Sequence, residues 1–210
     1  MHKNITGIIL SGGKSSRMGE NKSLLKLGPK TVIEHVVELM QSIFSEVILI
    51  TNTPEEYHFL NIPMYADIYK YKGPIAGIHS GLTHSNTKTN FVISCDIPLL
   101  TSEIIEYIIN YKTDVPITVC KADGFIQQLA GKYSKALLPQ IESILKIHEE
   151  EIRNPNQKKR KCSVLSLLDI AGAEIIDTGK LEFYKDGTFS NMNRPEDYQA
   201  ILKMFIPQAR

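Results

Sequence analysis

Short apolar runs and amphipathic segments alternate along the first 120 residues of the chain. The runs at 5–10, 47–51, 63–66, 91–94 and 115–120 predict buried strands. Between them, apolar residues recur every three or four positions, which predicts helices that pack one face on a sheet. These positions are Ile33, Val36, Val37, Met40 and Phe44 in the first helix, Ile75 to Leu82 in the second, and Ile104, Ile105 and Ile108 in the third. The alternation predicts an α/β fold whose mainly parallel sheet carries helices on both faces.

The pattern is less regular in the second half of the chain. Residues 127–133 and 173–176 predict further strands, and 163–168 and 195–205 predict helices. Another helix face is expected at Leu137, Leu138, Ile141, Ile144 and Leu145, and the terminal helix is expected to bury Tyr198, Ile201, Leu202 and Phe205. The stretch 149–161 is almost wholly polar, so we expect it to be solvated and mobile. No internal repeat is evident, and 210 residues suit one α/β core.

The charge balance narrows the classes of function. The chain has 24 Lys and Arg against 23 Asp and Glu, with 42% hydrophobic residues, which excludes a disordered or strongly basic protein. The basic run Lys158–Lys161 is interpreted as an exposed face rather than a nucleic-acid contact, because a net charge of +1 gives no basic field. No apolar run approaches the roughly 18 residues of a membrane helix, and no secretory signal is evident. We therefore expect a cytoplasmic protein with no nucleic-acid or membrane partner.

The cysteines and histidines show no pattern of a metal site or a covalent nucleophile. Cys95, Cys120 and Cys162 include no Cys-x-x-Cys pair, so free and mostly buried thiols are expected. The six histidines form no zinc-binding or catalytic motif. Covalent catalysis therefore has no evident nucleophile in this sequence.

A loop rich in glycine follows the first strand. It reads Leu10-Ser11-Gly12-Gly13-Lys14-Ser15-Ser16-Arg17-Met18-Gly19-Glu20-Asn21-Lys22. A Walker A loop is excluded because its first glycine would fall on Ile8, and the spacing of Gly12, Gly13 and Gly19 does not match a dinucleotide-binding fingerprint. Adjacent glycines, backbone N–H groups and the cations Arg17 and Lys22 suit a triphosphate. The alternative is an ordinary glycine turn with incidental basic residues.

A carboxylate stands at the end of the strand predicted at 91–94. Asp96 is followed by Ile97-Pro98, and an Asp at the carboxyl end of a parallel strand lies at the ligand-binding edge of the sheet. Hard oxygen ligands of this kind bind Mg²⁺ together with water and phosphate oxygens. The alternative is that Asp96 only closes the turn.

Two more segments carry candidate ligand contacts. Asp67 precedes Lys72-Gly73-Pro74-Ile75-Ala76-Gly77, and Gly77 and Gly81 are costly inside a helix unless a base, a ribose or another group packs closely against them. Near the C-terminus, Asn191 and Asn193 alternate on what we interpret as a strand leading into a capped helix, so both point to one face. One Asn suffices for capping, and two on one face favour a ligand.

These motifs together resemble the molybdenum cofactor guanylyltransferase family, the molybdopterin-guanine dinucleotide biosynthesis protein A type of nucleotidyltransferase. The resemblance covers essentially the whole chain through Leu10-Ser11-Gly12-Gly13 with Arg17-Met18-Gly19 and Lys22, Gly73-Pro74-Ile75-Ala76-Gly77, Cys95-Asp96-Ile97-Pro98 and Asn191-Met192-Asn193-Arg194-Pro195-Glu196-Asp197. It implies one Rossmann-like three-layer α/β/α domain over residues 1–210, of the nucleotide-diphospho-sugar transferase type. Residues 1–100 would mainly bind nucleotide and 101–210 mainly the acceptor.

The resemblance also implies roles for individual residues. The GTP-binding residues would be Leu10, Ser11, Gly12, Gly13, Lys22, Asn52, Asp67 and Asp96, the catalytic ones Arg17, Lys22 and Asp96, and the acceptor-binding ones Asn191 and Asn193. Asp96 would hold Mg²⁺, and Asn52 and Asp67 would lie around the guanosine. Two positions depart from the family: Ser11 replaces the usual Ala, which we expect to be harmless, and Gln128 replaces the usual Pro in the wall of the pterin pocket.

The expected reaction transfers GMP from GTP to the terminal phosphate of molybdopterin, with or without molybdenum. Transient contacts with other proteins of molybdenum-cofactor synthesis or with molybdoenzyme chaperones are also implied. One alternative is a cytidylyl- or sugar-phosphate nucleotidyltransferase that uses the same loop and Asp96. Another is a catalytically silent nucleotide-binding partner in cofactor delivery, although such a module need not keep Arg17, Lys22 and Asp96 together.

Overall fold

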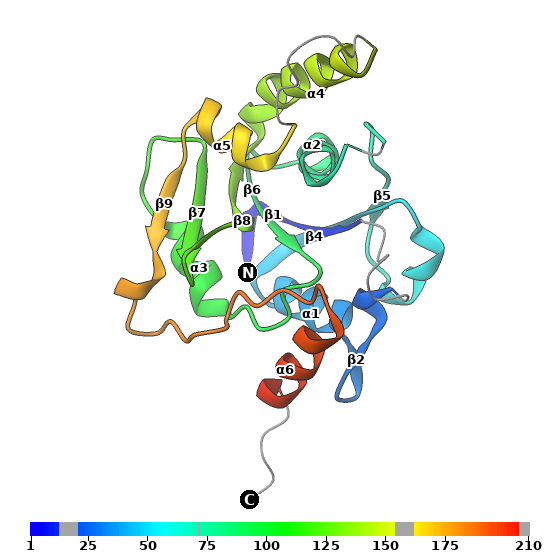
Figure 1. Cartoon of the computed structure of the whole chain (residues 1–210), viewed down its shortest axis with the longest axis vertical. Helices are drawn as coiled ribbons and strands as arrows, with labels where there is room; N and C mark the ends of the chain where they lie inside the picture. Colours follow the sequence, from blue (N-terminus) through cyan, green and yellow to red (C-terminus); the bar gives the residue numbers. More distant parts are fainter. Residues whose placement is uncertain (13–20, 71, 154–161, 206–210) are drawn as a thin grey trace, which may run out of the picture.

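A mainly parallel sheet forms the centre of the molecule in a computed structural model, which describes residues 1–12, 21–70, 72–153 and 162–205 (Figure 1). Its seven strands have the order β5-β4-β1-β6-β8-β7-β9. Their bounds are β1 His2–Ser11, β4 Phe44–Thr51, β5 Met64–Tyr65, β6 Thr89–Ser94, β7 Ile117–Ala122, β8 Phe125–Ser134 and β9 Glu174–Asp177. Only β8 is antiparallel to its neighbours within this sheet. The α/β fold with a mainly parallel sheet is confirmed.

The reversed direction of β8 follows from the tight turn that precedes it. Asp123 and Gly124 join β7 to β8 and both have positive φ, 53° and 82°. A two-residue loop of this kind matches the twist of antiparallel strands, and Asp-Gly is a preferred sequence for it. The chain therefore returns directly beside β7 and inserts β8 between β6 and β7.

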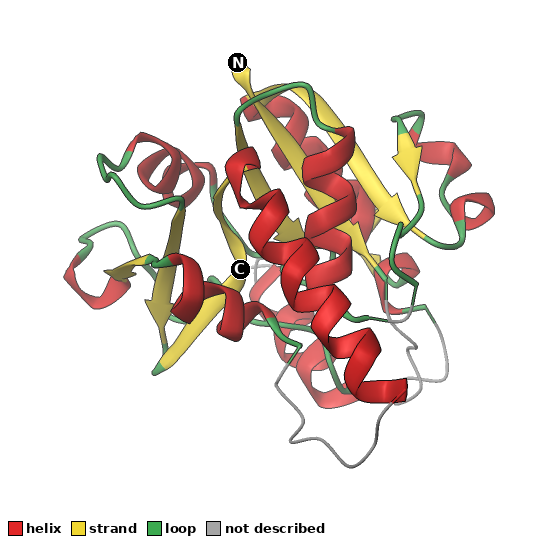
Figure 2. Cartoon of the chain, turned by 90° about the horizontal axis from the view of Figure 1, so that it is seen from above, coloured by secondary structure: helices red, strands yellow, loops and turns green. Residues whose placement is uncertain are grey.

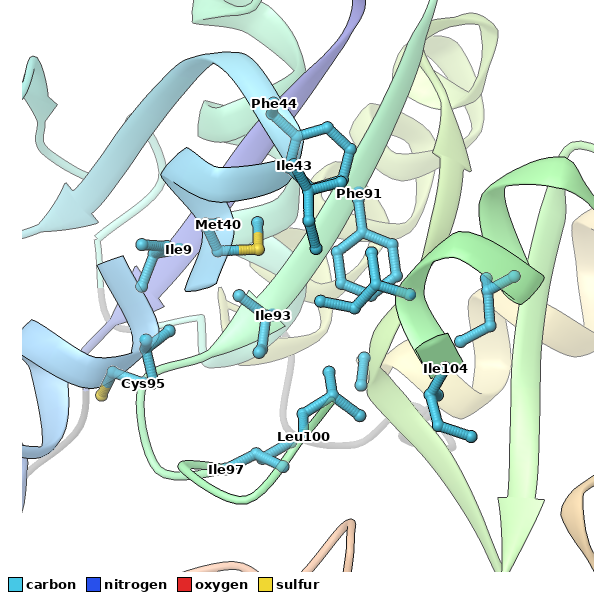
Figure 3. Close-up of a cluster of buried hydrophobic side chains, with 14 of the residues drawn as sticks. Ile9, Met40, Ile43, Phe44, Phe91, Ile93, Cys95, Ile97, Leu100 and Ile104 are labelled. Atoms are coloured by element: carbon cyan, nitrogen blue, oxygen red, sulfur yellow. The ribbon is translucent and has the colours of Figure 1, made fainter. Parts of the chain in front are cut away.

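Helices cover both faces of the sheet and complete three layers. They are α1 Val32–Ile43, α2 Pro74–His84, α3 Ser102–Asn110, α4 Leu138–Arg153, α5 Val164–Ala171 and α6 Pro195–Phe205. One core joins α1 and α3 to the β1 and β6 side chains Ile9, Phe91 and Ile93 (Figure 3). The other core joins α2, α4 and α5 to Ile8 and Val92, and helices lie over the sheet when the molecule is seen from above (Figure 2).

Shorter elements connect the sheet to its C-terminal helix. The hairpin of β2 (Lys26–Leu27) and β3 (Lys30–Thr31) follows the 3₁₀ helix η1 (Lys22–Leu24). A third apolar cluster packs α6 on this hairpin through Leu27, Val32, Met192 and Ile201. The remaining 3₁₀ helices are η2 Pro54–Glu56, η3 His58–Leu60, η4 Lys135–Leu137 and η5 Thr178–Lys180. The C-terminal segment is thereby held beside the first loops of the chain.

Several sequence predictions of local structure were wrong. Phe44 begins β4 rather than ending α1: its backbone is extended and its ring stacks on Phe91 at 5.9 Å between centroids. Residues 115 and 116 precede β7, which begins at Ile117: the Pro116 carbonyl accepts the Ser134 N–H, but Pro116 has no N–H to donate to the ladder.

The polar stretch from 149 also differs from expectation, because α4 continues through its first five residues to Arg153. Backbone hydrogen bonds can extend a helix through polar residues without an apolar face, and Glu149 lies 4.0 Å from the ammonium of Lys72. The basic run 158–161 lies outside the described residues.

Burial of the thiols agrees with the sequence prediction for two cysteines. Cys95 and Cys120 are buried free thiols, and burial raises the pKa of each to about 12. Cys162 is half-buried. In the part of the chain that the structure describes, no helix is long and apolar enough to cross a bilayer.

Candidate active site

The carboxyl ends of β1 and β6 meet where the strand order changes direction. From β1 the chain crosses to β4 and β5 on one side and then, through α2, to β6 on the other. The two strands are parallel neighbours, and beyond the ladder Cys95 donates its N–H to the Leu10 carbonyl at 3.0 Å. Open α/β sheets bind ligands at such a switch point. Ser11 and Asp96 therefore lie at the edge where a ligand is expected.

Asp96 is the centre of a small polar cluster at this edge. It is 7% exposed, its Oδ1 accepts a hydrogen bond from the Ser94 hydroxyl, and its Oδ2 accepts one from the Lys22 ammonium. The Lys22 Nζ also donates to the Asn193 Oδ1 at 3.1 Å. The ammonium of Lys22 in η1 thus joins two other predicted site residues. Asp96 follows the end of β6, and Asn193 lies in the segment before α6.

The segment carrying Asn191 and Asn193 is not a strand. It is irregular, and it is attached to the Asp96 loop because Met192 donates its N–H to the Asp96 carbonyl at 3.1 Å. The Met192 side chain is fully buried between its two half-buried or exposed Asn neighbours. The burial of residues 191–193 therefore alternates as it does in a strand, although the segment is hydrogen-bonded to a loop and not to another strand.

Neither Asn caps α6. The carboxylate of Asp197 accepts the backbone N–H groups of Asn193 and Arg194 at 2.9 and 2.8 Å. The Asn193 side chain is instead turned to Lys22, and the Asn191 amide donates to the Phe189 carbonyl at 3.4 Å. Since neither side chain accepts a hydrogen bond from the first turn of α6 among the contacts described, the two Asn side chains need another explanation than capping.

Asn52 and Asp67 form a second polar pair at the ends of β4 and β5. The Asn52 amide donates to Asp67 Oδ2 at 2.8 Å, and the Asp67 N–H donates to Asn52 Oδ1 at 3.1 Å. Burial raises the pKa of the Asp67 carboxyl, and the hydrogen bond from Asn52 opposes part of that shift. Within the described residues, no hydrogen bond or ion pair joins this pair to the Lys22–Asp96 cluster. The site therefore has two polar centres along one sheet edge.

The glycines of α2 pack against strand side chains. A Cβ on Gly81 would lie 2.5 Å from Ile8 Cγ2, and one on Gly77 would lie 3.2 Å from Leu10 Cδ2. The expectation that a base or a ribose requires these glycines is corrected: the close approach of α2 to β1 requires them. Gly77 still borders the candidate site, because its Cβ would lie 3.7 Å from Asp67 Oδ1.

The start of the glycine loop is described as far as Gly12. Leu10 packs in the core below α2, and the space beside the Gly12 Cα is open. The Ser11 side chain is 6% exposed and its hydroxyl donates to the Tyr57 hydroxyl at 2.8 Å, so the expectation that it is harmless overlooks a specific contact. Gly13 and Arg17 lie outside the described residues, as does Gly19.

Sequence reasoning assigned no role to Ser94, Asn21 or Tyr57. Ser94 is an ordinary final strand residue, and its contact with Asp96 follows from their two-residue spacing. Asn21 is adjacent to Lys22, and Tyr57 is an aromatic residue in a loop, so neither carries a motif. Only the folded chain shows that Asn21 and Tyr57 are hydrogen-bonded, at 2.7 Å.

The donor set around Asp96 is compatible with a magnesium ion. No group of three or more His, Cys, Asp or Glu side chains gathers among the residues described here. Mg²⁺ does not require such a group, because it is commonly held by one or two carboxylates together with substrate phosphates and water. Asp96, oriented by the hydroxyl of Ser94, fits that description.

Comparisons with known proteins agree on one family. The family model of the MobA-like NTP transferase domain matches residues 7–159. The "probable molybdenum cofactor guanylyltransferase" of Carboxydothermus hydrogenoformans is 36% identical over 205 residues, which is 97% of this chain and 98% of that protein. The protein of the same name from Aquifex aeolicus is 34% identical over 94% of this chain and 90% of its own length.

A solved structure shares the fold. The crystal structure named molybdopterin-guanine dinucleotide biosynthesis protein A from Archaeoglobus fulgidus is similar with a TM-score of 0.74, at 22% identity, over 95% of this chain and 97% of that one. The three-layer arrangement with a mainly parallel sheet is therefore shared with a protein of that type.

Proposed function

The chain belongs to the molybdenum cofactor guanylyltransferase family of MobA-like NTP transferases, and we propose that it transfers GMP from GTP to the terminal phosphate of molybdopterin, with or without molybdenum. The products are molybdopterin guanine dinucleotide and pyrophosphate. The observation that carries the proposal is the meeting of Lys22, Asp96 and Asn193 at the switch point of the sheet. We place the reaction in the cytoplasm.

The proposed reaction needs no protein nucleophile. An oxygen of the acceptor phosphate attacks the α-phosphorus of GTP, a new P–O bond forms, and the bond from that phosphorus to the bridging oxygen breaks as pyrophosphate leaves. Cys95, beside Asp96, does not compete as a nucleophile, because burial and the Asp96 charge raise its thiol pKa to about 12. The work of the chain is to position two anions and neutralise charge.

We assign the positioning of the anions and the neutralisation of charge to individual residues. Asp96 would hold Mg²⁺, which when bound contributes positive charge next to the phosphates. The Lys22 ammonium, 23% exposed, is a second positive charge at the same place. Arg17 and the N–H groups of Gly12 and Gly13 would contribute further donors to the triphosphate. Ser94 keeps the Asp96 carboxylate in one orientation through its hydrogen bond.

The pair Asn52 and Asp67 suits the guanosine end of the nucleotide. Asp67 is a half-buried carboxylate that accepts from one side-chain donor among the residues described, so it has capacity for more hydrogen bonds. Guanine offers N–H donors on its pyrimidine ring, and adenine offers an acceptor at the corresponding ring position. An unpaired buried acceptor is costly, so Asp67 would favour GTP over ATP.

The enzyme assay tests the proposed function directly. Purified protein with Mg²⁺ and molybdopterin should release pyrophosphate with GTP, and turnover with ATP should be lower by about 10- to 100-fold, the value of one or two unpaired buried groups. Asp67→Asn should reduce the ratio of turnover with GTP to turnover with ATP. Asp169→Asn, at an exposed position on α5, is the control. Transfer with CTP or UTP to a sugar or alcohol phosphate, but none with molybdopterin, would identify a different nucleotidyltransferase.

The two Asn residues before α6 should affect the acceptor rather than the nucleotide. Asn191→Ala and Asn193→Ala should retain GTP affinity and lose about 10-fold in molybdopterin affinity, since each removes one or two polar contacts. Calorimetric titration of each ligand checks this, with Asn86→Ala, at the opposite end of the sheet, as the control. Loss of GTP binding in both variants would assign the segment to the nucleotide half. We also propose that this segment belongs to an acceptor-binding half built mainly by residues 101–210.

A further inference from the structure

The hydroxyl of Tyr57 joins both ends of the glycine loop. Tyr57 follows η2, is 2% exposed, and packs its ring in the core below α1. Its hydroxyl lies 2.8 Å from Ser11 Oγ, 2.7 Å from Asn21 Nδ2 and 2.9 Å from Ser23 Oγ. Ser11 ends β1, whereas Asn21 and Ser23 lie on either side of Lys22. A single phenol therefore contacts the chain at both ends of the loop.

The donors and acceptors of this group admit one arrangement. A phenol has one O–H to donate and accepts two hydrogen bonds. Ser11 and Asn21 supply the two donors, and the Ser23 hydroxyl donates to Asn21 Oδ1 at 2.7 Å. The Tyr57 O–H must therefore donate to Ser23 Oγ. Fully paired buried networks fix local geometry, and removing one member leaves the others unsatisfied.

Asn21 extends the same network to the backbone of η1. Its Oδ1 also accepts the Ser23 N–H at 3.2 Å, and its amide makes a second donation to Glu56. Both N–H groups and the carbonyl oxygen of this side chain are thus used. The first turn of η1, which contains Lys22, is held in place from Tyr57 and from Glu56.

Lys22 benefits from this support because its own side chain is flexible. An ammonium on a four-carbon stem loses considerable rotamer freedom when it is fixed. Its Nζ reaches both Asp96 and Asn193, which lie 74 and 171 residues away in the sequence. A backbone shift at Lys22 would move the ammonium from this position, and displacement of a catalytic group by about 1 Å can cost about 100-fold in rate.

We propose that Tyr57 is a positioning residue for the transfer reaction: its phenol ties η1 to the end of β1 and so sets the position of the Lys22 ammonium. The proposal rests on the function proposed above. Ser11 makes the arrangement stronger in this chain, because an alanine there would supply no donor to Tyr57. The Tyr57 hydroxyl is hydrogen-bonded to Asn21 and Ser23, on either side of Lys22, and acts through these neighbours.

Removal of the phenol oxygen tests the proposal. Tyr57→Phe keeps the ring in the core and should lower kcat by about 10- to 100-fold, because Lys22 loses its position while the apolar packing is retained. Tyr184→Phe is the control: it removes the hydroxyl of another tyrosine that packs against the same core, which donates to Asp123 in the turn between β7 and β8, and should keep kcat. Wild-type kcat in Tyr57→Phe would overturn the proposal.

A double-mutant cycle separates positioning from a general loss of stability. In the Lys22→Ala background, Tyr57→Phe should give no further fall in kcat, because the group that it positions is absent. The same fold decrease in both backgrounds would show that Tyr57 does not act through Lys22. Ser23→Ala removes the acceptor of the phenol proton without changing the ring. It should lower kcat in the wild-type background and not in the Lys22→Ala background, and any other result would also contradict the proposal.

The experiment distinguishes this proposal from the reaction itself. If the wild-type protein transfers no GMP to molybdopterin, the proposed function is wrong. Binding of GTP with Mg²⁺, measured by calorimetry, then provides the second readout: Tyr57→Phe should weaken binding several-fold in the wild-type background and not in Lys22→Ala. Equal weakening in both backgrounds would overturn the role of Tyr57 independently of the acceptor.

Discussion

Asp96→Asn should leave the fold intact and reduce GMP transfer by about two to three orders of magnitude. The substitution is nearly isosteric, but it removes the charge that would hold Mg²⁺ against the phosphates. In the wild type the Asp96 carboxylate accepts a hydrogen bond from the Lys22 ammonium. In the variant a neutral amide stands at this place. The variant would therefore hold Mg²⁺ less tightly and would leave the Lys22 ammonium without its carboxylate partner.

The structure provides an argument against the view that Asp96 only closes a turn. In the described part of the chain its carboxylate accepts from the side chains of Ser94 and Lys22, whereas an Asx-turn would use a backbone N–H. Pyrophosphate release across a Mg²⁺ titration decides between the two interpretations, with Asp169→Asn as an exposed control. Wild-type kcat with an unchanged metal midpoint would show that Asp96 has no catalytic role.

Lys22→Ala should cost about 2–4 kcal/mol of transition-state stabilisation, the usual contribution of one well-placed charged donor. It should also lower the free energy of unfolding by about 1–3 kcal/mol, because the Asp96 carboxylate stays buried without its cation. Lys26→Ala removes an exposed lysine of the adjacent hairpin and should change neither quantity appreciably.

Two measurements separate the parts of this effect. Steady-state kinetics gives the loss in kcat/KM, and urea denaturation gives the loss of stability. The double variant Lys22→Ala with Asp96→Asn should recover part of the stability while activity stays low, because the unpaired buried charge is then absent. If the Lys22→Ala protein keeps a kcat/KM near that of the wild type, Lys22 has no role in the mechanism. We expect the same loss of activity for Arg17→Ala.

Element order and type were predictable from the chain alone. Periods of two and of three to four residues, together with glycine and proline at the element ends, depend on local backbone geometry, so β1, α1, β4, α2 and β6 could be located within a few residues. The motifs around Asp67, Asp96 and Asn193 were identifiable for the same reason, because each occupies the end of a predicted element. The antiparallel β8 also had a local signal in the Asp-Gly turn at 123–124.

Local errors occurred where burial rather than backbone preference decides the structure. Phe44 continues the helical spacing of α1, but its ring is needed against Phe91 and it belongs to β4. Asn191 and Asn193 show strand-like alternation without a strand, because the buried Met192 docks on a loop. Hydrophobic periodicity reports which face is buried, and it does not report what covers that face.

Sequence by itself determined the fold class, the family and the residue types available for phosphate chemistry at the carboxyl edge of the sheet. Tertiary structure alone decided that Lys22 meets both Asp96 and Asn193, and that Tyr57 closes the network behind Lys22. The physical reason is that these contacts connect loops far apart in the chain, and the apolar packing that brings the loops together is non-directional and leaves no periodic signal. Positions of elements follow from local preferences, but the pairing of polar groups between loops follows only from the completed core.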